Sequence, residues 1–453
     1  MASPLFWPGI YYFYLIGNTS AVSLTRDIPP GVPANLLLLL CGDPRNVLYT
    51  VFCESAQMPR RLDFTCCDYD SGILARDSLL FAMVLDDVPQ DAMWDIAFHM
   101  YLNDRSISTL ADQCHKLIAC AGTLDSWHAS PYGRVIRISS EYTLQELRRL
   151  WNLYLETASP GCPRMRGLRS QADDRRKAIW LEQKDSLKWS SARSSEPLSA
   201  QSVFVYSQQF HHYWKTGTTS YGGEDLPHVN PTFLQSRRGE GFHIHYGTDP
   251  LAPFHLAPYF GNHKTGSFTP SEMVSAARSQ FQEWCQAFRM RVRASQTNTP
   301  LLVRFPLGDV ICVARALGKR NRPSTSCPAP SVPVAPWTAQ PIVLSAAEYD
   351  DHQAPTSFDV IDTSNVSDHV GMLNILLVTA PLLSATSPWS GVLYTESLLA
   401  HRGDAATQIM SILPADLSAV AMLFDLCPVD ALSVSEAYSL TSLLVLSAYR
   451  RSV

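Results

Sequence analysis

Acidic and small polar residues follow four apolar stretches of the chain, each at the point where a strand is expected to end. The apolar stretches are short and continuous, as in strands that are buried on both faces of a parallel sheet. Because the carboxyl ends of parallel strands meet at the same end of a sheet, we expect these polar residues to converge on one crevice. The groups are Gly42-Asp43-Pro44, Asp68, Asp309 and Asp362-Thr363-Ser364-Asn365.

Such a crevice has the chemistry that an adenosyl ligand needs. A glycine turn lets the backbone approach a ligand closely, and an acid about 20 residues later can accept hydrogen bonds from ribose hydroxyls. Asp68 follows Gly42 by 26 residues. We expect Gly42 and Asp43 to shape the methionine end of S-adenosylmethionine, while Asp68 would hold the ribose. Asp309 would face the adenine amino group. The candidate catalytic residues, near the transferred methyl group, are Asp362, Ser364 and Asn365.

The turn after the first strand argues against a phosphate-binding site. Dinucleotide folds carry G-x-G-x-x-G, whereas this turn has the single glycine Gly42. Asp43 puts negative charge beside a helix N-terminus, which disfavours a pyrophosphate but tolerates a sulfonium and an amino group. The pattern therefore favours S-adenosylmethionine over NAD. A structural interpretation remains open, in which the glycine forms a tight turn and each acid caps a helix.

The elements expected to position these residues have the order of a Rossmann-like fold. A strand at 35–41, a helix at 45–54, a strand at 62–68 and a helix at 71–85 make a β-α-β unit. Further strands are expected at 301–305 and 357–365. Further helices are expected at 93–102, after a capping box of Thr143 and Glu146, at 271–296 and at 369–382. The predicted fold class is α/β, with a mostly parallel sheet of the class I methyltransferase type and large loop-rich and helical insertions.

Changes in composition divide the chain into five segments. Residues 1–158 form the N-terminal half of the Rossmann-like domain, and 159–270 form an insertion that is basic up to about residue 200 and then rich in histidine and aromatic residues. A helix and a strand at 271–317 return to the sheet, and a proline-rich, exposed linker covers 318–356. Residues 357–453 complete the domain. Its last apolar run, 439–449, is helix-like and lies close to the end of the chain, so we expect a truncated or divergent C-terminus.

The composition excludes several classes of protein. A net charge of −5 and a pI near 6.2 give no overall attraction to nucleic acid or membranes. The eleven cysteines include no C-x-x-C pair, which favours reduced thiols in a cytosolic or nuclear compartment, and we expect a cytoplasmic protein. No apolar run is long enough to span a bilayer. We expect another protein as the partner, and no membrane or nucleic acid.

Two further segments have alternative functional interpretations. His243 and His245 would share one face of a strand, and His255 with Asp249 could complete a metal shell, but no second ligand pair has a fixed spacing. We expect no metal. The arginine-rich part of the insertion could contact nucleic acid, although a charge run is usually a solvated surface. Motifs of hydrolases and kinases are absent.

Several blocks of the sequence resemble a fungal family of unknown function that also occurs beside MYND zinc fingers and is related to the N-terminal domain of axonemal dynein assembly factors. The blocks are 13–52, 62–81, 245–260 and 358–383, with CGDPRN and IDTSN-x-x-DHVG as the most specific parts. The resemblance implies a methyltransferase-like fold that places Gly42, Asp43, Asp68, Asp309 and Asp362 at cofactor positions. Leu40 stands where a small residue is expected, and this chain has no MYND finger.

Two functional hypotheses follow. The first is an S-adenosylmethionine-dependent methyltransferase with an unknown acceptor. The second is a non-catalytic assembly or adaptor protein that keeps the fold as a scaffold and acts through protein contacts, since one fold serves many functions.

Overall fold

The computed structural model describes residues 13–54, 58–159, 161–223, 225–234, 241–262, 268–294, 300–320, 331–350, 354–385, 391–397, 413, 417–428 and 445–451. Its centre is a sheet of eight described strands in the order β4-β6-β2-β1-β7-β8-β10-β9. The strands are β1 (Ala34–Leu39), β2 (Leu62–Cys67), β4 (Ile136–Ile138), β6 (Leu301–Phe305), β7 (Val360–Asp362), β8 (Val392–Ser397), β9 (Leu426–Pro428) and β10 (Val445–Arg451).

The first six strands of this order are parallel, and β10 pairs antiparallel with both β8 and β9. If the edge strand β4 is left out and the other seven strands (β1, β2, β6, β7, β8, β9 and β10) are renumbered 1 to 7 in chain order, the spatial order of the sheet is 3-2-1-4-5-7-6. Its first five positions follow the order of a Rossmann sheet, so the predicted fold class is confirmed.

Strand β1 lies at the centre because its side chains are apolar on both faces. Leu36 and Leu38 belong to one buried cluster, and Leu37 and Leu39 belong to a second cluster on the opposite face. Successive side chains of a strand point to opposite faces, so all the leucines of a continuous run are buried only when helices cover both faces of the sheet.

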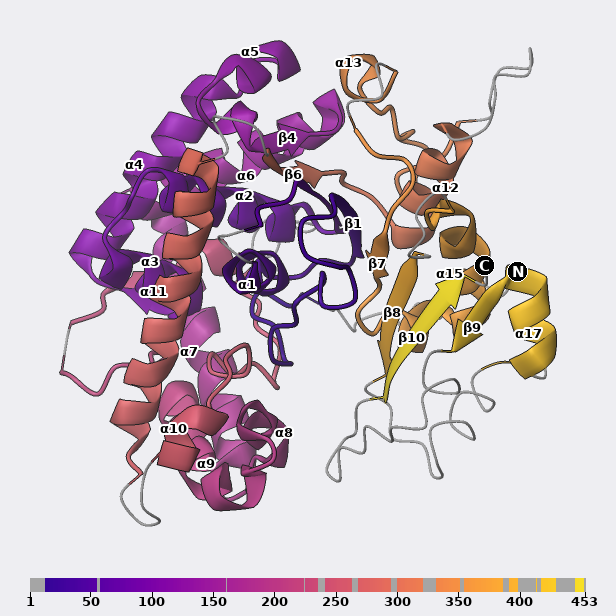
Figure 1. Ribbon diagram of the computed structural model, residues 1–453. Coiled ribbons are helices and arrows are strands. Elements are labelled where there is room, and N and C mark those ends of the chain that lie inside the picture. Colours follow the sequence, from indigo (N-terminus) through magenta and orange to yellow (C-terminus); the bar gives the residue numbers. More distant parts are fainter. Residues whose placement is uncertain are drawn as a thin grey trace.

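Figure 1 shows these two layers on either side of the sheet. One layer contains α1 (Arg45–Cys53), α2 (Ser71–Leu85), α3 (Gln90–Phe98), α4 (Asp104–Cys120), α5 (Leu124–Ala129), α6 (Glu141–Ala158) and α11 (Pro270–Ala294). The other contains α12 (Val310–Arg320), α13 (Ala346–Tyr349), α14 (Ser367–Val370), α15 (Met372–Thr379) and α17 (Leu417–Phe424).

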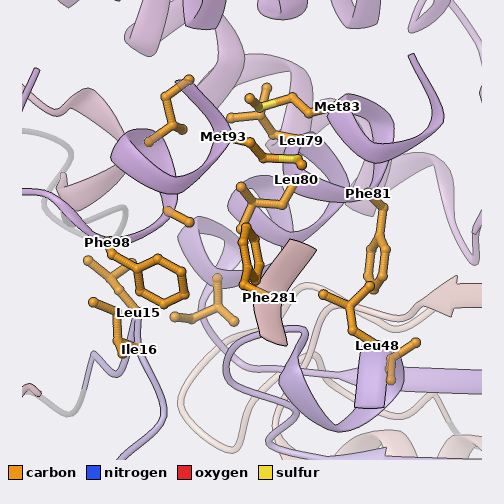
Figure 2. Close-up of a cluster of buried hydrophobic side chains, with 14 of the residues drawn as sticks. Leu15, Ile16, Leu48, Leu79, Leu80, Phe81, Met83, Met93, Phe98 and Phe281 are labelled. Atoms are coloured by element: carbon orange, nitrogen blue, oxygen red, sulfur yellow. The ribbon is translucent and has the colours of Figure 1, made fainter. Parts of the chain in front are cut away.

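The larger core lies between α2, α3, α11 and the N-terminal segment, which we define as residues 13–28. In Figure 2, Leu15 and Ile16 of this segment lie beside Phe98 of α3, and Phe281 of α11 lies beside Leu80 of α2. All five side chains are buried. The segment therefore packs into the core as firmly as the helices do.

The insertion is more helical than its composition predicts. It forms α7 (Pro163–Gln183), α8 (Trp189–Ala192), α9 (Ser199–Thr216) and α10 (Ala257–Asn262), which lie together at the lower left of Figure 1. The lack of a clear apolar period over 203–270 predicts a loop-rich segment, which is wrong for residues 203–216. Helix α9 buries Val203, Tyr206, Phe210 and Tyr213 along with polar residues, so its apolar period was hard to detect.

Several other boundaries differ from the prediction. The helix expected at 93–102 ends at Phe98, because Tyr101 and Leu102 pair with β5 (His228–Val229) as the short strand β3 (Tyr101–Leu102). The capping box is wrong: the N-cap of α6 is Ser140, whose side chain accepts from the Thr143 amide.

The C-terminal half also departs from the prediction. The helix expected at 369–382 is interrupted at Gly371, which has a φ of 84°. The described part of the helix-like run at 439–449 is a strand, β10, while residues 439–444 lie outside the described residues. The part of the proline-rich linker at 331–350 packs against the sheet, and its Glu348 is buried.

Candidate functional site

A cleft lies at the carboxyl ends of β1, β2 and β7, where the sequence predicted it. Its cavity volume is about 50 Å³, so a larger ligand would also extend over the open side of the cleft. We call it the strand-end cleft. Its lining residues are Tyr14, Gly17, Asn18, Leu40, Cys41, Gly42, Arg45, Asn46, Asp68, Ile73, Asp362, Ser364 and Asn365.

The turn after β1 forms the floor of the cleft. Gly42 has a φ of 60°, in the left-handed region that glycine adopts without strain. Leu40 has a φ of 61° and also lines the cleft, although a leucine is rarely left-handed. The residue that the resemblance marks as unusual therefore takes an unusual backbone conformation at the cleft.

Asp68 follows β2 directly and is almost completely buried in the cleft wall. Its Oδ1 accepts a hydrogen bond from the Asp70 amide at 2.9 Å. Burial raises the pKa of Asp68 to about 7. The N-cap of α2 is Asp70, which accepts from the Gly72 amide at 2.8 Å, so Asp68 does not serve as that helix cap.

Asp362, Ser364 and Asn365 meet in the cleft after β7. Asp362 accepts from the Ser364 amide at 3.1 Å and from the Asn46 side chain of α1 at 3.3 Å. Burial raises the pKa of Asp362. The structure thus brings the three candidate catalytic residues together with Gly42 and Asp68.

Asp43 lies beside the cleft without being one of its lining residues, and its carboxylate binds other parts of the chain. Its Oδ2 accepts from the Gly17 amide at 2.8 Å, and its Oδ1 pairs with Nη1 of Arg45 at 2.5 Å. Asp43 therefore fastens the N-terminal segment to the turn after β1.

Asp309 caps a helix. Its Oδ1 accepts from the backbone amides of Ile311 and Cys312 at 3.0 and 3.3 Å, at the start of α12. It does not line the strand-end cleft. The cap interpretation that the sequence left open fits Asp309, and the structure separates this residue from the other candidates.

Several residues at the cleft were missed by the sequence reasoning. Arg45 opens α1, lines the cleft and donates through Nη2 to Thr19 at 3.1 Å. Burial works to lower the pKa of Arg45, but the ion pair with Asp43 raises it overall. Glu396 of β8 does not line the cleft, but its backbone amide donates to the carbonyl of the lining residue Ser364 at 2.7 Å. Burial, reinforced by the charge of Asp362, raises the pKa of Glu396 to about 7.

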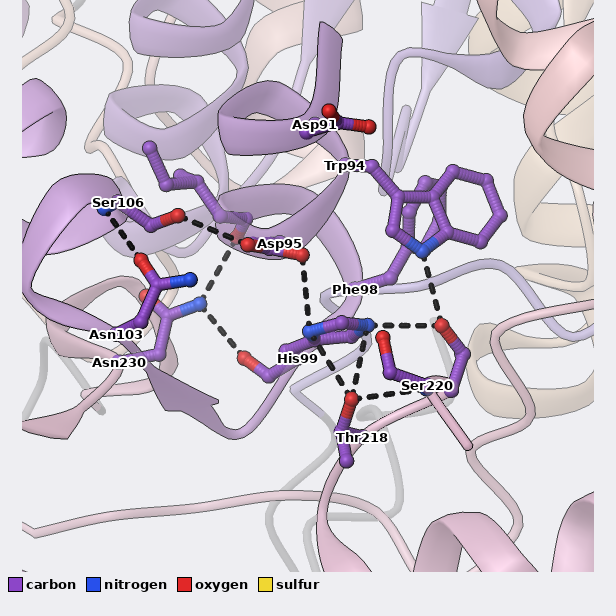
Figure 3. A network of polar contacts seen from close by, with 12 residues as sticks. Asp91, Trp94, Asp95, Phe98, His99, Asn103, Ser106, Thr218, Ser220 and Asn230 are labelled. Atoms are coloured by element: carbon purple, nitrogen blue, oxygen red, sulfur yellow. Dashed lines mark hydrogen bonds and ion pairs between the residues drawn. The ribbon is translucent and has the colours of Figure 1, made fainter. Parts of the chain in front are cut away.

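A second polar cluster resembles a catalytic triad but is closed to solvent. In Figure 3, His99 lies between Asp95 and the hydroxyls of the 218–219 turn; its Nδ1 is 3.2 Å from Asp95 and its Nε2 is 2.8 Å from Thr219 Oγ1. His99 is 1% exposed and Thr219 is 0% exposed. Burial lowers the pKa of His99 to about 3. The cluster therefore connects α3 to the turn after α9, and a substrate cannot reach it.

The histidine-rich segment contacts the N-terminal segment. Tyr14 lies 3.3 Å from Nε2 of His245, and His255 donates to the Ala21 carbonyl at 2.8 Å. Asp249 accepts from the Leu251 amide at 2.9 Å. Within the described residues, no group of three or more His, Cys, Asp or Glu could hold a metal ion.

The arginines of the insertion largely hold its own helices. Arg169 donates to the Leu226 carbonyl at 2.8 Å, and Arg176 donates to the Trp214 carbonyl at 3.2 Å. Arg169 also stacks on the Tyr101 ring at 4.0 Å. These contacts account for part of the positive charge without a nucleic acid.

Comparison with known proteins gives one match. Residues 15–106, which run from the N-terminal segment to the start of α4, match a family described as a domain of unknown function, DUF4470. The match covers the turn after β1 and Asp68. No curated protein matches the chain. No solved structure matches it either. Over the described residues, each helix is too short or too polar to cross a membrane.

Proposed function

We propose that the strand-end cleft binds S-adenosylmethionine and that the protein is a methyltransferase-like enzyme acting on an unknown acceptor. The observation that carries this proposal is that Gly42, Asp68 and Asp362 come from three neighbouring parallel strands and line one cleft. Ligands of open α/β sheets bind in this position, outside the carboxyl ends of the strands.

The residues of the cleft fit the groups of such a ligand. Gly42 leaves room for close backbone approach, and Asp68 offers carboxylate oxygens to ribose hydroxyls. When bound, S-adenosylmethionine supplies the methyl group on a positively charged sulfur. The carboxylate of Asp362 and the polar side chains of Ser364 and Asn365 would lie on that side, to orient the acceptor and receive its proton.

The strand order departs from that of a dinucleotide-binding sheet. Strand β10 lies reversed between β8 and β9, whereas dinucleotide-binding Rossmann sheets end 4-5-6. The turn after β1 has a single glycine and lacks the G-x-G-x-x-G motif that binds a pyrophosphate. Both features favour an adenosyl ligand without a pyrophosphate.

Calorimetry with S-adenosylhomocysteine and the intact, folded chain tests the proposal. We expect saturable binding, and weaker binding of NAD. Adenosine serves as a second probe, because it retains the ribose hydroxyls that Asp68 would accept. No heat of binding with any of these at millimolar concentration would reject the adenosyl site.

A second function is favoured by specific observations. Asp43 and Asp309 are occupied by structural contacts, and Leu40 lines the cleft at a position where a small residue is expected. Trp189 of α8 and Phe204 of α9 are 51% and 63% exposed, as side chains at protein interfaces often are. Under this alternative, the protein is a cytoplasmic assembly or adaptor scaffold, in line with the resemblance to dynein assembly factors.

The alternative predicts a stable protein partner without methyl transfer. Tagged wild-type chain and a Trp189→Ser, Phe204→Ser variant would be compared by quantitative affinity purification. Partners recovered by the wild type and lost with the variant would favour the scaffold. Methyl transfer, together with identical recovery by both chains, would reject it.

A further inference from the structure

One wall of the strand-end cleft is a short loop between two buried anchors. We call residues 17–20 the gate loop; Gly17 and Asn18 line the cleft. Before the loop, Leu15 and Ile16 are 3% and 1% exposed in the core. After it, Ala21 is 1% exposed. The chain is therefore fixed on both sides of the loop by apolar burial, which the loop itself lacks.

The contacts that follow the gate loop belong to its second anchor. The Ala21 amide donates to the Pro253 carbonyl at 2.8 Å, and the Leu24 amide donates to Thr50 of α1 at 3.0 Å. These bonds would persist if the loop alone moved.

Two charged side chains from the turn after β1 fasten the gate loop. Asp43 accepts from the Gly17 amide at 2.8 Å, and Arg45 donates to the Thr19 hydroxyl at 3.1 Å. Asp43 and Arg45 also pair with each other at 2.5 Å. The ion pair thus joins the loop to the floor of the cleft and acts as a latch.

The latch is closely fitted to a glycine. A Cβ atom at position 17 would lie 2.1 Å from Nη1 of Arg45 and 2.3 Å from its Cζ, so the guanidinium packs directly on Gly17. The closed arrangement also leaves Nε of Arg45 buried without a hydrogen-bond partner among the described residues. A buried donor without a hydrogen-bond partner destabilises the closed arrangement, so the net free energy that holds the loop closed is smaller than the ion pair and hydrogen bonds alone would give.

We propose that the gate loop opens as a unit between its two anchors, with Asp43 and Arg45 as the latch, and so controls access to the strand-end cleft. In the open form the loop leaves the floor at Cys41 and Gly42, and the ion pair of the latch remains. This inference goes beyond the proposed function, since it holds for any ligand of the cleft.

The thiol of Cys41 reports opening without a ligand. Cys41 lines the cleft and is 8% exposed; its Sγ lies 3.9 Å from Oδ2 of the buried Asp77, and burial raises the pKa of the thiol, so it reacts only when opening admits water and reagent. Cys53 is exposed and serves as an internal reference. The intact chain would be treated with iodoacetamide, and the modification rates of the two cysteines would be read by peptide mass spectrometry. The ratio of the two rates measures access to the cleft, because differences in iodoacetamide concentration between samples affect both cysteines equally.

Thr19→Val and Asp43→Asn each weaken the latch, and Thr25→Val is the matched control. Thr25 is in the same segment and donates to Glu54, outside the gate loop. We expect the Cys41 ratio to rise about three- to tenfold in Thr19→Val, the size expected for one lost hydrogen bond. Asp43→Asn should raise it at least as much, and the control should match the wild type.

Two results would overturn the gate. One is a Cys41 ratio in Thr19→Val equal to that of the wild type. The other is an equal rise in Thr25→Val, because the whole segment would then loosen together. If Asp43→Asn fails to fold, Thr19→Val still decides the question. Since no adenosyl ligand is present, this assay can fail while the adenosyl proposal stands, and the reverse is equally possible.

Discussion

Asn46 of α1 donates its side-chain amide to Asp362 of β7 at 3.3 Å, across 316 residues of sequence. The bond joins the first helix of the β-α-β unit to the last residue of β7, the neighbour of β1 in the sheet. It shows why the cleft needs both halves of the chain: the insertion and the proline-rich segment separate residues that the sheet brings together.

Replacing Asp68 by alanine should weaken binding of S-adenosylhomocysteine. Above pH 7 the carboxylate of Asp68 is ionised and can accept hydrogen bonds from ribose hydroxyls, and hydrogen bonds to a charged acceptor are stronger than those to a neutral one. We expect at least about a tenfold loss of affinity, equal to about 1.4 kcal/mol, by calorimetry. Asp309→Asn is the control, because its amide oxygen can still cap α12 outside the cleft. An equal loss in both variants would contradict the assignment.

Asp68 should also make the stability of the protein depend on pH. Its pKa is raised by burial to about 7, so the folded chain holds a proton that the unfolded chain releases near pH 4. Stability therefore falls as the pH rises from about 4 to about 7, and this contribution is constant above that range. Urea unfolding of Asp68→Asn should give a flatter profile between about pH 5 and pH 7 than the wild type.

Glu396 should contribute in the same direction, because its pKa is also raised to about 7. The Glu396→Gln variant separates the two groups. Identical slopes in the wild type and both variants would show that neither carboxyl is protonated in the folded chain.

Arg304 of β6 should be essential for stability. It donates to both carboxylate oxygens of Asp63 at 2.7 and 3.0 Å and also binds Glu348, and all three side chains are buried. Without Arg304, Glu348 keeps its ion pair with Arg137. Among the described residues, buried Asp63 then keeps as its ion-pair partner only the half-exposed Arg61, at 3.7 Å. Because the charge of Asp63 is then poorly compensated, Arg304→Ala should cost about 3–5 kcal/mol in urea unfolding.

The exposed pair of Arg320 with Asp350 provides the control for this measurement. Arg320→Ala should change the free energy of unfolding by about 1 kcal/mol or less. A similar small effect of Arg304→Ala would mean that Asp63 and Glu348 are neutral or reach water in the folded protein.

Leu40→Gly should widen the strand-end cleft at little cost. The left-handed conformation of Leu40 costs about 1–2 kcal/mol, and glycine removes this cost. Two effects oppose the gain: the apolar contacts of the leucine side chain are lost, and glycine increases the conformational entropy of the unfolded chain. We expect stability within about 1 kcal/mol of the wild type and tighter binding of S-adenosylhomocysteine. Unchanged or weaker binding would show that Leu40 does not restrict the ligand.

The sequence predicted the centre of the fold well, because physical patterns there are local. The leucine run of β1, the helix Ser71–Leu85 and the strand Leu301–Phe305 follow from apolar continuity and period alone. Strands β4 and β8 were missed. The first is three residues long, and the second carries Thr395 and Glu396 in its interior or near its end, so neither has the apolar continuity of a central strand.

The cleft was predictable only in part, since a residue's type does not reveal its partners. Asp68 and Asp362 were placed correctly because strand ends converge in any parallel sheet. Asp43 follows the same strand as Gly42, yet its carboxylate binds Gly17, which only the path of the N-terminal segment determines. Asp309 satisfies its own helix start. The roles of Tyr14 and Arg45 depend on the same long-range packing.

The most direct test of the central claim is an experimental structure of the intact chain with S-adenosylhomocysteine at saturating concentration. We predict that the ligand lies in the strand-end cleft, with its ribose hydroxyls within hydrogen-bond distance of Asp68 and its sulfur on the side of Asp362. A ligand bound elsewhere, or a cleft without ligand at millimolar concentration, would contradict the account.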